Sequence, residues 1–443
     1  MSLIALAATA PGVSLSLSGA AAPAGLAAAA FGVSIVGAAF LLAWAAEAAQ
    51  VDVSAGLAVA VLALIAVLPE YAVDFVFAWR GGGAVQEYGV DCRAPGEGAS
   101  ACSLALANMT GANRILVGIG WALVVVIAWR RARRRGVPAA EASAVRLGRP
   151  DAVPLAFLLI ASIYCLVLPF KRTLTLADTA VLVGIFAAYT WRISRAPAGN
   201  PDLIGPSAWL GGLPPKVRRS MVVAVFLTAA TVILLTAEHF ADALVESGTA
   251  MGVSEFMLVQ WLAPLASEAP ELLVAALYAW RLHTNEALGA LVSSKVNQWT
   301  LLVGTLPIVF AVSSGGLSGL PIDPAQREEL LLTAAQSLLA VALLIRLRLT
   351  VRSALLLLGL FLTQFVVSAV APGVARGAEL VWLSAVYLGL AAVVLIRDRA
   401  AVLPLLRDGL VSSYRSLGDP ACCTTAGRLR LRVDEAVDAG QSR

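Results

Sequence analysis

Two glutamates stand inside apolar segments of membrane-spanning length, and the residues around them repeat. Glu70 lies in IAVLPEYAVDFVFAWR and Glu271 in LASEAPELLVAALYAWR. Each glutamate follows a proline and is separated by seven residues from an Ala-Trp-Arg triplet, and the two motifs are offset by 201 residues. An ionised carboxylate at the centre of a membrane helix costs at least ~2.5 kcal/mol. Two such carboxylates at equivalent places predict a duplicated ion site.

The prolines before these glutamates, Pro69 and Pro270, add to the same chemistry. A proline inside a helix removes one backbone hydrogen bond and frees a carbonyl oxygen. In a membrane, such a break is tolerated where it lines a polar cavity. A free carbonyl beside a carboxylate is suited to binding a cation. The alternative, an ordinary proline kink with a glutamate that pairs or reaches headgroup water, must hold at both places.

The composition of the chain specifies the surroundings of these residues. The 443 residues are 59% hydrophobic and 14% charged, with a mean hydropathy of +0.84, which excludes a soluble globular protein. Apolar runs long enough to cross a bilayer recur along the chain. The eleven expected spans are 25–49, 55–79, 103–129, 153–170, 174–191, 220–246, 254–280, 286–312, 329–347, 353–371 and 378–396.

Basic residues predict the orientation of these spans. With eleven spans, four Lys/Arg clusters fall on one side, which the positive-inside rule makes the cytoplasmic side. The N-terminus is then outside, the C-terminus is cytoplasmic, and we expect the protein in the plasma (inner) membrane. The net charge of +4 therefore reflects topology and not a nucleic-acid partner. The clusters are residues 130–135, 192–219, 346–352 and 397–407.

The equivalent motifs divide the chain into two halves. Five spans per half is an odd number, so the second half enters the membrane from the opposite side, and such inverted repeats are common in secondary transporters. The predicted fold is an all-α polytopic membrane protein with two inverted five-helix repeats and an extra C-terminal transmembrane helix. The expected parts are a weakly ordered N-terminus (1–24), the first repeat (25–195), a linker (196–218), the second repeat (219–371), the extra helix (378–396) and a cytoplasmic tail (397–443).

Cys92 and Cys102 lie together in a connection predicted to be outside, where a disulfide is plausible, and the sequence leaves open whether it forms. The adjacent pair Cys422 and Cys423 in the tail is weak evidence for a metal or a lipid anchor. The role of the tail itself is open.

At these residues the chain resembles the sodium/calcium exchanger superfamily, in which each of two repeats carries a Pro-Glu helix followed by a helix of the Gly-Ser-Asn type. The resemblance covers roughly residues 25–370. The second repeat carries it through Leu265-Ala266-Ser267-Glu268-Ala269-Pro270-Glu271 and Ser293-Ser294-Lys295-Val296-Asn297-Gln298. The first repeat carries it through Leu68-Pro69-Glu70 and Asn108-Met109-Thr110-Gly111-Ala112-Asn113.

The resemblance implies that the two glutamates bind the transported cation, with hydroxyl and amide ligands from the four central helices. Glu70 and Glu271 are then the principal ligands. Matching Ala105-Leu106 to Ala287-Leu288 offsets the second helices by 182 residues, whereas matching the Leu-Val-Gly triplets gives 186, so both asparagines of the first repeat stay candidates. The candidate secondary ligands are Ser267, Asn108, Asn113, Ser294, Asn297 and Gln298.

Four departures from the family pattern alter the expected charge of the site. Ala66-Val67 replaces a Thr-Ser pair, so the first repeat loses hydroxyl ligands. Asp74, at i+4 from Glu70, and Glu268, one turn before Glu271, add carboxylates. Lys295 stands where the family has asparagine, and Arg114 follows Asn113; we therefore interpret Lys295 and Arg114 as charge gates. Lys295 as a structural partner of Glu268 is the alternative interpretation.

These departures favour a secondary antiporter that exchanges a monovalent cation, Na⁺, for H⁺ by alternating access. Calcium requires six to eight oxygen ligands and carboxylates that compensate its charge, which a lysine would offset. The alternatives are Ca²⁺/Na⁺ or Ca²⁺/H⁺ exchange and, in another class, a transport-inactive membrane receptor or scaffold. No enzyme motif is present, and no cofactor is expected beyond the transported Na⁺, H⁺ or Ca²⁺. The expected partners are the lipid bilayer and inorganic cations, with no nucleic acid and no protein partner inferable. The ion, the stoichiometry, the direction and the oligomeric state stay open.

Overall fold

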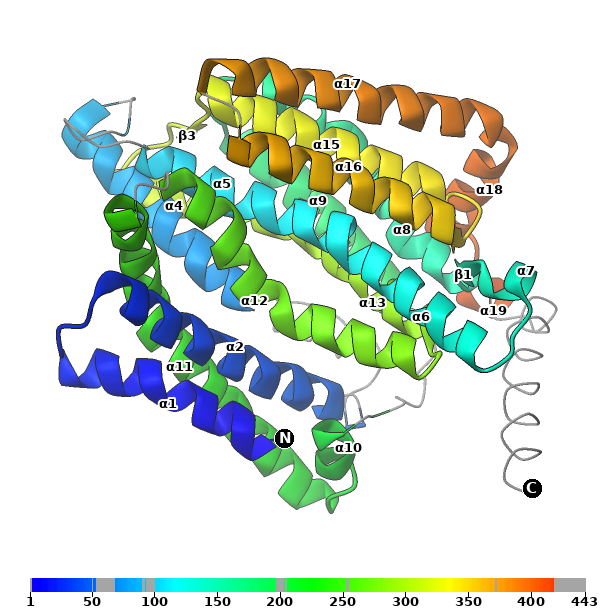
Figure 1. The fold of residues 1–443 in the computed structure, drawn as a ribbon, viewed down its shortest axis with the longest axis horizontal. Coiled ribbons are helices and arrows are strands. Elements are labelled where there is room, and N and C mark those ends of the chain that lie inside the picture. Colours follow the sequence, from blue (N-terminus) through cyan, green and yellow to red (C-terminus); the bar gives the residue numbers. More distant parts are fainter. Residues whose placement is uncertain are drawn as a thin grey trace. The chain divides into compact units, whose positions relative to one another are not determined.

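Figure 1 shows the chain as a set of long helices joined by short turns and four short strands among the residues described. The computed structural model describes residues 2–49, 51–52, 68–89, 92, 100–196, 203, 205–251, 255–370 and 373–417. The first half of the expected span 55–79, the Ala66-Val67 pair, Ser254, much of the 196–218 linker, and Cys422 and Cys423 lie outside these residues.

The elements follow one another without long loops. In the first part of the chain they are α1 (Ser2–Ser18), α2 (Ala24–Ala49), α4 (Leu68–Tyr88), α5 (Ala101–Ile115), the π-helix η2 (Leu116–Trp121), α6 (Ala122–Arg134), α7 (Ala139–Ala142), β1 (Ala144–Arg146), the 3₁₀ helix η3 (Arg149–Asp151), α8 (Ala152–Cys165), the 3₁₀ helix η4 (Leu168–Phe170), β2 (Thr173–Leu174), α9 (Leu176–Ile193) and α10 (Pro206–Gly211). The remaining elements are α11 (Pro215–Met251), α12 (Glu255–Trp280), α13 (Thr284–Asn297), the π-helix η5 (Gln298–Leu302), α14 (Val303–Ser314), β3 (Leu320–Pro321), α15 (Pro324–Leu344), β4 (Arg348–Thr350), α16 (Val351–Val370), α17 (Gly373–Arg397), α18 (Arg399–Leu410) and α19 (Tyr414–Leu417).

Seven of the described helical stretches are long and apolar enough to cross a membrane. An eighth is α12, whose pieces Met257–Ala269 and Glu271–Trp280 are bent by 53° at the proline between them. The bend is the effect expected of a proline that removes a backbone hydrogen bond inside a helix. The all-α polytopic membrane fold predicted from composition is confirmed, whereas the number of eleven spans stays a prediction.

By its internal packing the chain divides into two units. The first comprises residues 1–115, 167–271 and 297–330, and the second comprises residues 116–166, 272–296 and 331–443. Their boundaries fall inside α12, α13 and α15 and between α5 and η2. Each unit therefore consists of segments that are far apart in the sequence.

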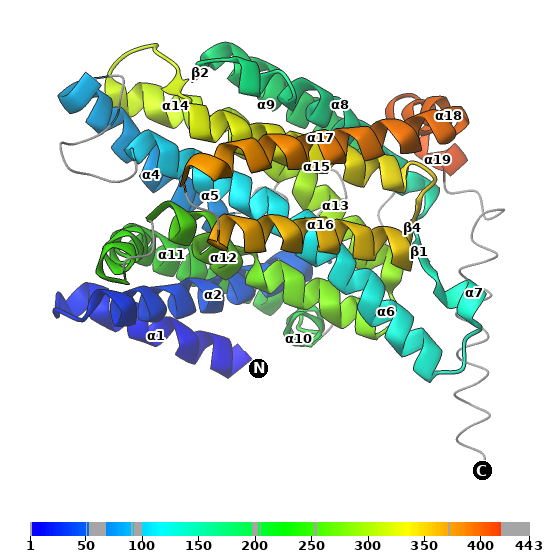
Figure 2. The ribbon, with the colours of Figure 1, turned by 45° about the horizontal axis from the view of Figure 1, so that its top comes forward.

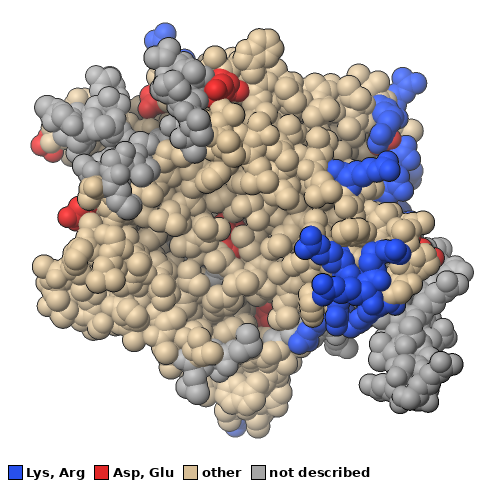
Figure 3. All heavy atoms as spheres, viewed as in Figure 1, with Lys and Arg blue, Asp and Glu red and all other residues tan. Residues whose placement is uncertain are grey.

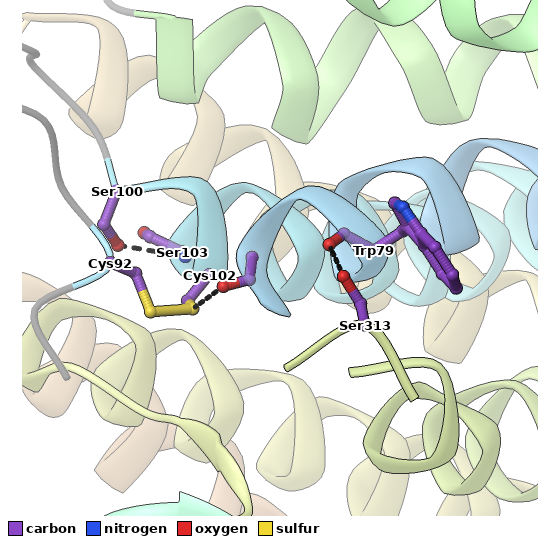
Figure 4. Close-up of a disulfide and its surroundings, with 7 residues drawn as sticks. Trp79, Cys92, Ser100, Cys102, Ser103 and Ser313 are labelled. Carbon is purple, nitrogen blue, oxygen red and sulfur yellow. Dashed lines mark hydrogen bonds between the residues drawn. A yellow bond between two sulfur atoms is a disulfide. The ribbon is translucent and has the colours of Figure 1, made fainter. Parts of the chain in front are cut away.

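In the first unit, α4 packs against both α5 and α14. Gly82 permits the close approach of α14, since a Cβ there would lie 2.8 Å from the carbonyl oxygen of Phe310. Figure 4 shows the disulfide between Cys92 and Cys102, which joins the connection after α4 to the start of α5. The bond that the sequence left open is therefore present, and it ties together the two helices of the first repeat that carry candidate ligands.

Residues 1–24, expected to be weakly ordered, instead contain helix α1. It lies along α2, as both ribbon views show (Figures 1 and 2). The buried hydroxyl of Ser34 accepts a hydrogen bond from the backbone N–H of Gly12 at 2.8 Å and lies within bonding distance of the carbonyls of Ala8 and Thr9. Composition alone did not reveal this contact, because it depends on one serine in the neighbouring helix.

In the second unit, the start of the expected cytoplasmic tail is also folded. Helix α18 packs on α8 so closely that a Cβ at Gly409 would lie 2.5 Å from the carbonyl oxygen of Ala152. Arg149 donates from Nη2 to both carboxylate oxygens of Asp408, at 2.9 and 3.1 Å, and from Nη1 to the carbonyl of Ser416 at 3.1 Å. The expectation that the tail after residue 397 is only loosely structured is therefore wrong for residues 399–417.

Two structural features are consistent with the expected internal repeat. Strand β1 pairs with β4 in one unit and β2 pairs with β3 in the other, so each antiparallel sheet joins a strand of the first predicted repeat to one of the second. The π-helices η2 and η5 begin at residues 116 and 298, which are 182 positions apart. This is the offset given by the Ala-Leu pairs, and under it Asn113 is equivalent to Lys295.

Asp52, just after α2, binds the start of α11. Arg218 donates from Nε and Nη2 to the carboxylate at 2.6 and 2.7 Å, and Arg219 donates at 3.1 Å. The hydrogen bonds from Arg218 lower the pKa of Asp52 from 3.8 to about 2. A carboxylate whose pKa is lower in the folded state contributes stability above its unfolded pKa and loses it as the pH falls toward the folded value.

We therefore expect Asp52→Asn to lower the melting temperature at neutral pH, with a difference from wild type that shrinks from about pH 4 toward pH 2. Melting curves of the detergent-purified protein across this range check the expectation. A difference that stays constant at all pH values would show that the ion pair does not stabilise the fold.

Candidate functional site

The candidate site is built on α4, α5, α12 and η5 of the first unit. Glu70 lies in the first turn of α4 and is fully buried. Neither of its carboxylate oxygens has a hydrogen-bond partner among the described residues. Its electrostatic neighbours are three further carboxylates, those of Glu268, Glu271 and Asp74. A buried, unpartnered carboxylate among others is a group that needs a cation or a proton.

Two amides bind two of these carboxylates, one in each predicted repeat. Asn108 on α5 donates from Nδ2 to Oδ1 of Asp74 at 2.5 Å, and both side chains are buried. Gln298, the first residue of η5, donates from Nε2 to Oε1 of Glu268, and this pair is also buried. In the described residues, Oδ2 of Asp74 and Oδ1 of Asn108 accept no hydrogen bond. Each amide therefore fixes one carboxylate while acceptor oxygens remain for a cation.

The other candidate ligands are arranged less uniformly. Asn297 accepts a hydrogen bond at Oδ1 from the hydroxyl of Tyr71 at 3.3 Å, which links η5 to α4. Asn113 donates to the carbonyl of Met109 in its own helix at 2.9 Å, and Ser267 bonds carbonyls of its own helix. Ser294 has a buried hydroxyl with no hydrogen-bond partner among the described residues. Only Asn108, Asn297 and Gln298 bond to side chains across helices.

The carboxylates do not form a closed metal cage in this conformation. In the described part of the chain, no three His, Cys, Asp or Glu side chains lie close enough together to hold one metal ion. Glu70, Asp74 and Glu268 are fully buried, whereas Glu271 is half-buried. A cation at this site would therefore draw on amide and backbone oxygens as well as carboxylates, as a hard cation in a pocket of mixed oxygen ligands does.

The two residues interpreted as charge gates have different surroundings. Arg114 forms a fully buried ion pair with Glu329 on α15, so its charge is compensated inside the protein. The expectation that Arg114 acts as an uncompensated fixed charge at the site is therefore wrong. Lys295 is fully buried on α13, two residues before Asn297, and its role as a gate stays a prediction.

Sequence reasoning missed three buried polar residues in this unit. Tyr71 follows Glu70 directly, but a tyrosine in an apolar run gives no signal of its partner. Glu329 stands in the cluster Arg327-Glu328-Glu329 at the start of an expected span, where charges normally face water. Gln260 is buried on α12, and neither polar atom of its side chain has a hydrogen-bond partner among the described residues. A single amide inside an apolar stretch was the available signal.

A polytopic all-helical protein with buried, paired carboxylates near broken helices belongs to the class of membrane proteins that handle cations. The family model described as "Sodium/calcium exchanger protein" matches residues 22–194 and 221–370. Since this match covers well over half of the chain, the protein belongs to the sodium/calcium exchanger family. A search of curated proteins gave no match.

Several solved structures are similar to this chain. The structure described as that of the H⁺/Ca²⁺ exchanger CAX is 37% identical, with a TM-score of 0.82, over 94% of this chain and 97% of CAX. Native YfkE is 17% identical, with a TM-score of 0.57, over 82% of this chain and 98% of YfkE. The sodium-calcium exchanger NCX_Mj is 16% identical, with a TM-score of 0.50, over 79% and 99% of the two chains. The protein is thus an integral membrane antiporter of the cation exchanger superfamily.

Proposed function

We propose that the protein exchanges Ca²⁺ for H⁺ across the membrane by alternating access at a site centred on Glu70 and Glu271. The observation that carries this proposal is the group of four neighbouring carboxylates, three of them fully buried. The similarity to CAX, whose structure is described as that of an H⁺/Ca²⁺ exchanger, supports the choice of ions. Calcium prefers oxygen ligands whose negative charges compensate its own.

Proton coupling follows from burial. When the cation leaves, carboxylates in a site of low polarity cannot all remain ionised, because each loses solvation and repels the others. Protons that bind the vacated carboxylates remove this cost, and a returning cation displaces them. Competition of Ca²⁺ and H⁺ for the same oxygens is therefore sufficient for exchange, and the amides of Asn108 and Gln298 hold two of the carboxylates in place.

The sequence alone favoured Na⁺/H⁺ exchange because two basic residues were expected to weaken the binding of divalent cations. The ion pair between Arg114 and Glu329 removes half of that argument. Lys295, buried where the family has asparagine, is the observation that still favours a monovalent ion. Na⁺/H⁺ exchange is therefore the second candidate.

The orientation belongs to the same proposal. Figure 3 shows Lys and Arg side chains gathered at one end of the molecule, and the end of α6 contributes Arg130, Arg131, Arg133, Arg134 and Arg135. Such clusters stay on the cytoplasmic side. The disulfide between Cys92 and Cys102 favours an outside location for the α4–α5 connection, since disulfides persist in oxidising compartments.

Flux through purified protein in proteoliposomes with an internal pH dye tests the proposal. We expect external Ca²⁺ to drive protons out of the lumen, so that the internal pH rises, whereas Na⁺, K⁺ and Li⁺ at equal ionic strength do so far less. Ca²⁺ uptake that follows a Na⁺ gradient without proton movement would contradict it. A pH change produced by Na⁺ and not by Ca²⁺ would replace it with the second candidate, and Ca²⁺ binding without flux would indicate an inactive receptor.

A further inference from the structure

A buried ion pair joins α5 to α15 in the first unit. Nη1 of Arg114 donates to Oε2 of Glu329, and the two side chains are 0% and 2% exposed. The same two helices are joined by a hydrogen bond from Nε2 of Gln326 to the hydroxyl of Ser103 at 3.1 Å. Since Gln326 and Glu329 are three residues apart, they share one face of α15.

The guanidinium is also held by α5 and α12. Nε of Arg114 donates to the carbonyl of Thr110 at 3.2 Å, and the guanidinium lies over the ring of Trp261, 5.1 Å from its centroid. The arginine is therefore fixed by three elements, and its charge cannot move away into water.

This fixed charge lies near the candidate cation site. Arg114 is six residues after Asn108 on α5, and Trp261 is seven residues before Glu268 on α12. At about 1.5 Å per residue, both separations correspond to roughly 10 Å along a helix. The guanidinium is thus too far away to bind the carboxylates directly, but near enough that an unpaired charge would act on a cation through a medium of low polarity.

We infer that Glu329 sets the affinity of the site for divalent cations by neutralising Arg114. With the pair intact, the carboxylates at the site are available to compensate the cation. Without Glu329, Arg114 would place one positive charge about 10 Å from the site and repel a divalent ion twice as strongly as a monovalent ion. Glu329 is then a positioning and charge-balancing residue, and it makes no contact with the ion. The inference rests on the proposed function.

The test is the Ca²⁺ half-saturation of proton-coupled flux at alkaline pH, where the site is ionised. We expect Glu329→Gln to weaken half-saturation on the order of 100-fold, from a charge at about 10 Å and an effective dielectric constant of about 20, with the maximal rate little changed. The double variant R114Q/E329Q removes both charges, and we expect it to return half-saturation to within about threefold of wild type.

Two matched controls separate charge from packing. Glu328→Gln removes the same charge from the neighbouring, half-buried position of α15. Gln326→Ala removes the second bond between α5 and α15 without changing any charge. Both are expected to leave half-saturation within about threefold of wild type, although Gln326→Ala lowers the melting temperature.

The inference is overturned if Glu329→Gln binds Ca²⁺ as wild type does, or if the double variant is as weak as the single one. Should Glu329→Gln fail to fold, the double variant and the charge swap R114E/E329R still decide, because both must keep the wild-type half-saturation. A wild type that moves Na⁺ and not Ca²⁺ would refute the proposed function alone. The same series with Na⁺ would then test Glu329, with an expected shift on the order of tenfold.

Discussion

Glu70→Gln and Glu271→Gln are each expected to lower coupled exchange by more than about 100-fold. Glutamine keeps the size of the side chain but supplies no negative charge and releases no proton. Removing one partner from a buried charged interaction costs about 3–5 kcal/mol, and every 1.4 kcal/mol is a factor of ten. Glu70 is fully buried with no hydrogen-bond partner among the described residues, so its substitution disturbs packing very little.

The measurement is Ca²⁺-driven proton flux in proteoliposomes, together with the melting temperature of each variant. We expect both variants to melt at or above the wild-type temperature, because the glutamine removes the repulsion among the carboxylates. Glu238→Gln is the control, since this side chain on α11 is 69% exposed and pairs with Arg80 only at the surface. Full coupled flux in both Glu70→Gln and Glu271→Gln would refute the paired-glutamate mechanism.

The parts of the site that the sequence predicted are those that depend on local spacing. The repeated Pro-Glu motif indicated Glu70 and Glu271, and the helical period placed Asp74 on the face of Glu70. Glu268 followed from its place one turn before Glu271. These carboxylates are electrostatic neighbours in the structure, which the symmetry of the two motifs already suggested. Their roles as cation ligands stay a prediction.

The parts that could not be predicted depend on contacts between distant segments. Glu329 lies 215 positions from Arg114, and its neighbours Arg327 and Glu328 made it resemble an ordinary charge at a membrane boundary. The sequence proposed Asn108 and Asn113 equally, yet only Asn108 bonds across helices to a carboxylate, because a side chain five residues further along points to another face. Helix period restricts such choices but does not select the partner.

The packing of α5 against α12 leads to the second large expected effect. A Cβ at Gly111 would lie 1.8 Å from the carbonyl oxygen and 2.8 Å from the carbonyl carbon of Gln260. Both are backbone atoms, so no side-chain rotation relieves the clash and the two helices must separate. Because α5 carries Asn108 and α12 carries Glu268, their separation would also pull apart the ligands of the candidate site.

We therefore expect Gly111→Ala to destabilise the protein by about 3 kcal/mol or more, at the upper end of the cost of overpacking, and to abolish flux. The melting temperature and the monodisperse fraction after detergent extraction measure the first effect, and proteoliposome flux measures the second. Gly184→Ala on α9 is the matched control: its Cβ would meet no atom within 4 Å, and alanine favours a helix by up to about 1 kcal/mol over glycine. Wild-type stability and flux in Gly111→Ala would mean that α5 and α12 do not approach so closely in the membrane, and the two carboxylate–amide pairs would then need a different arrangement of their helices.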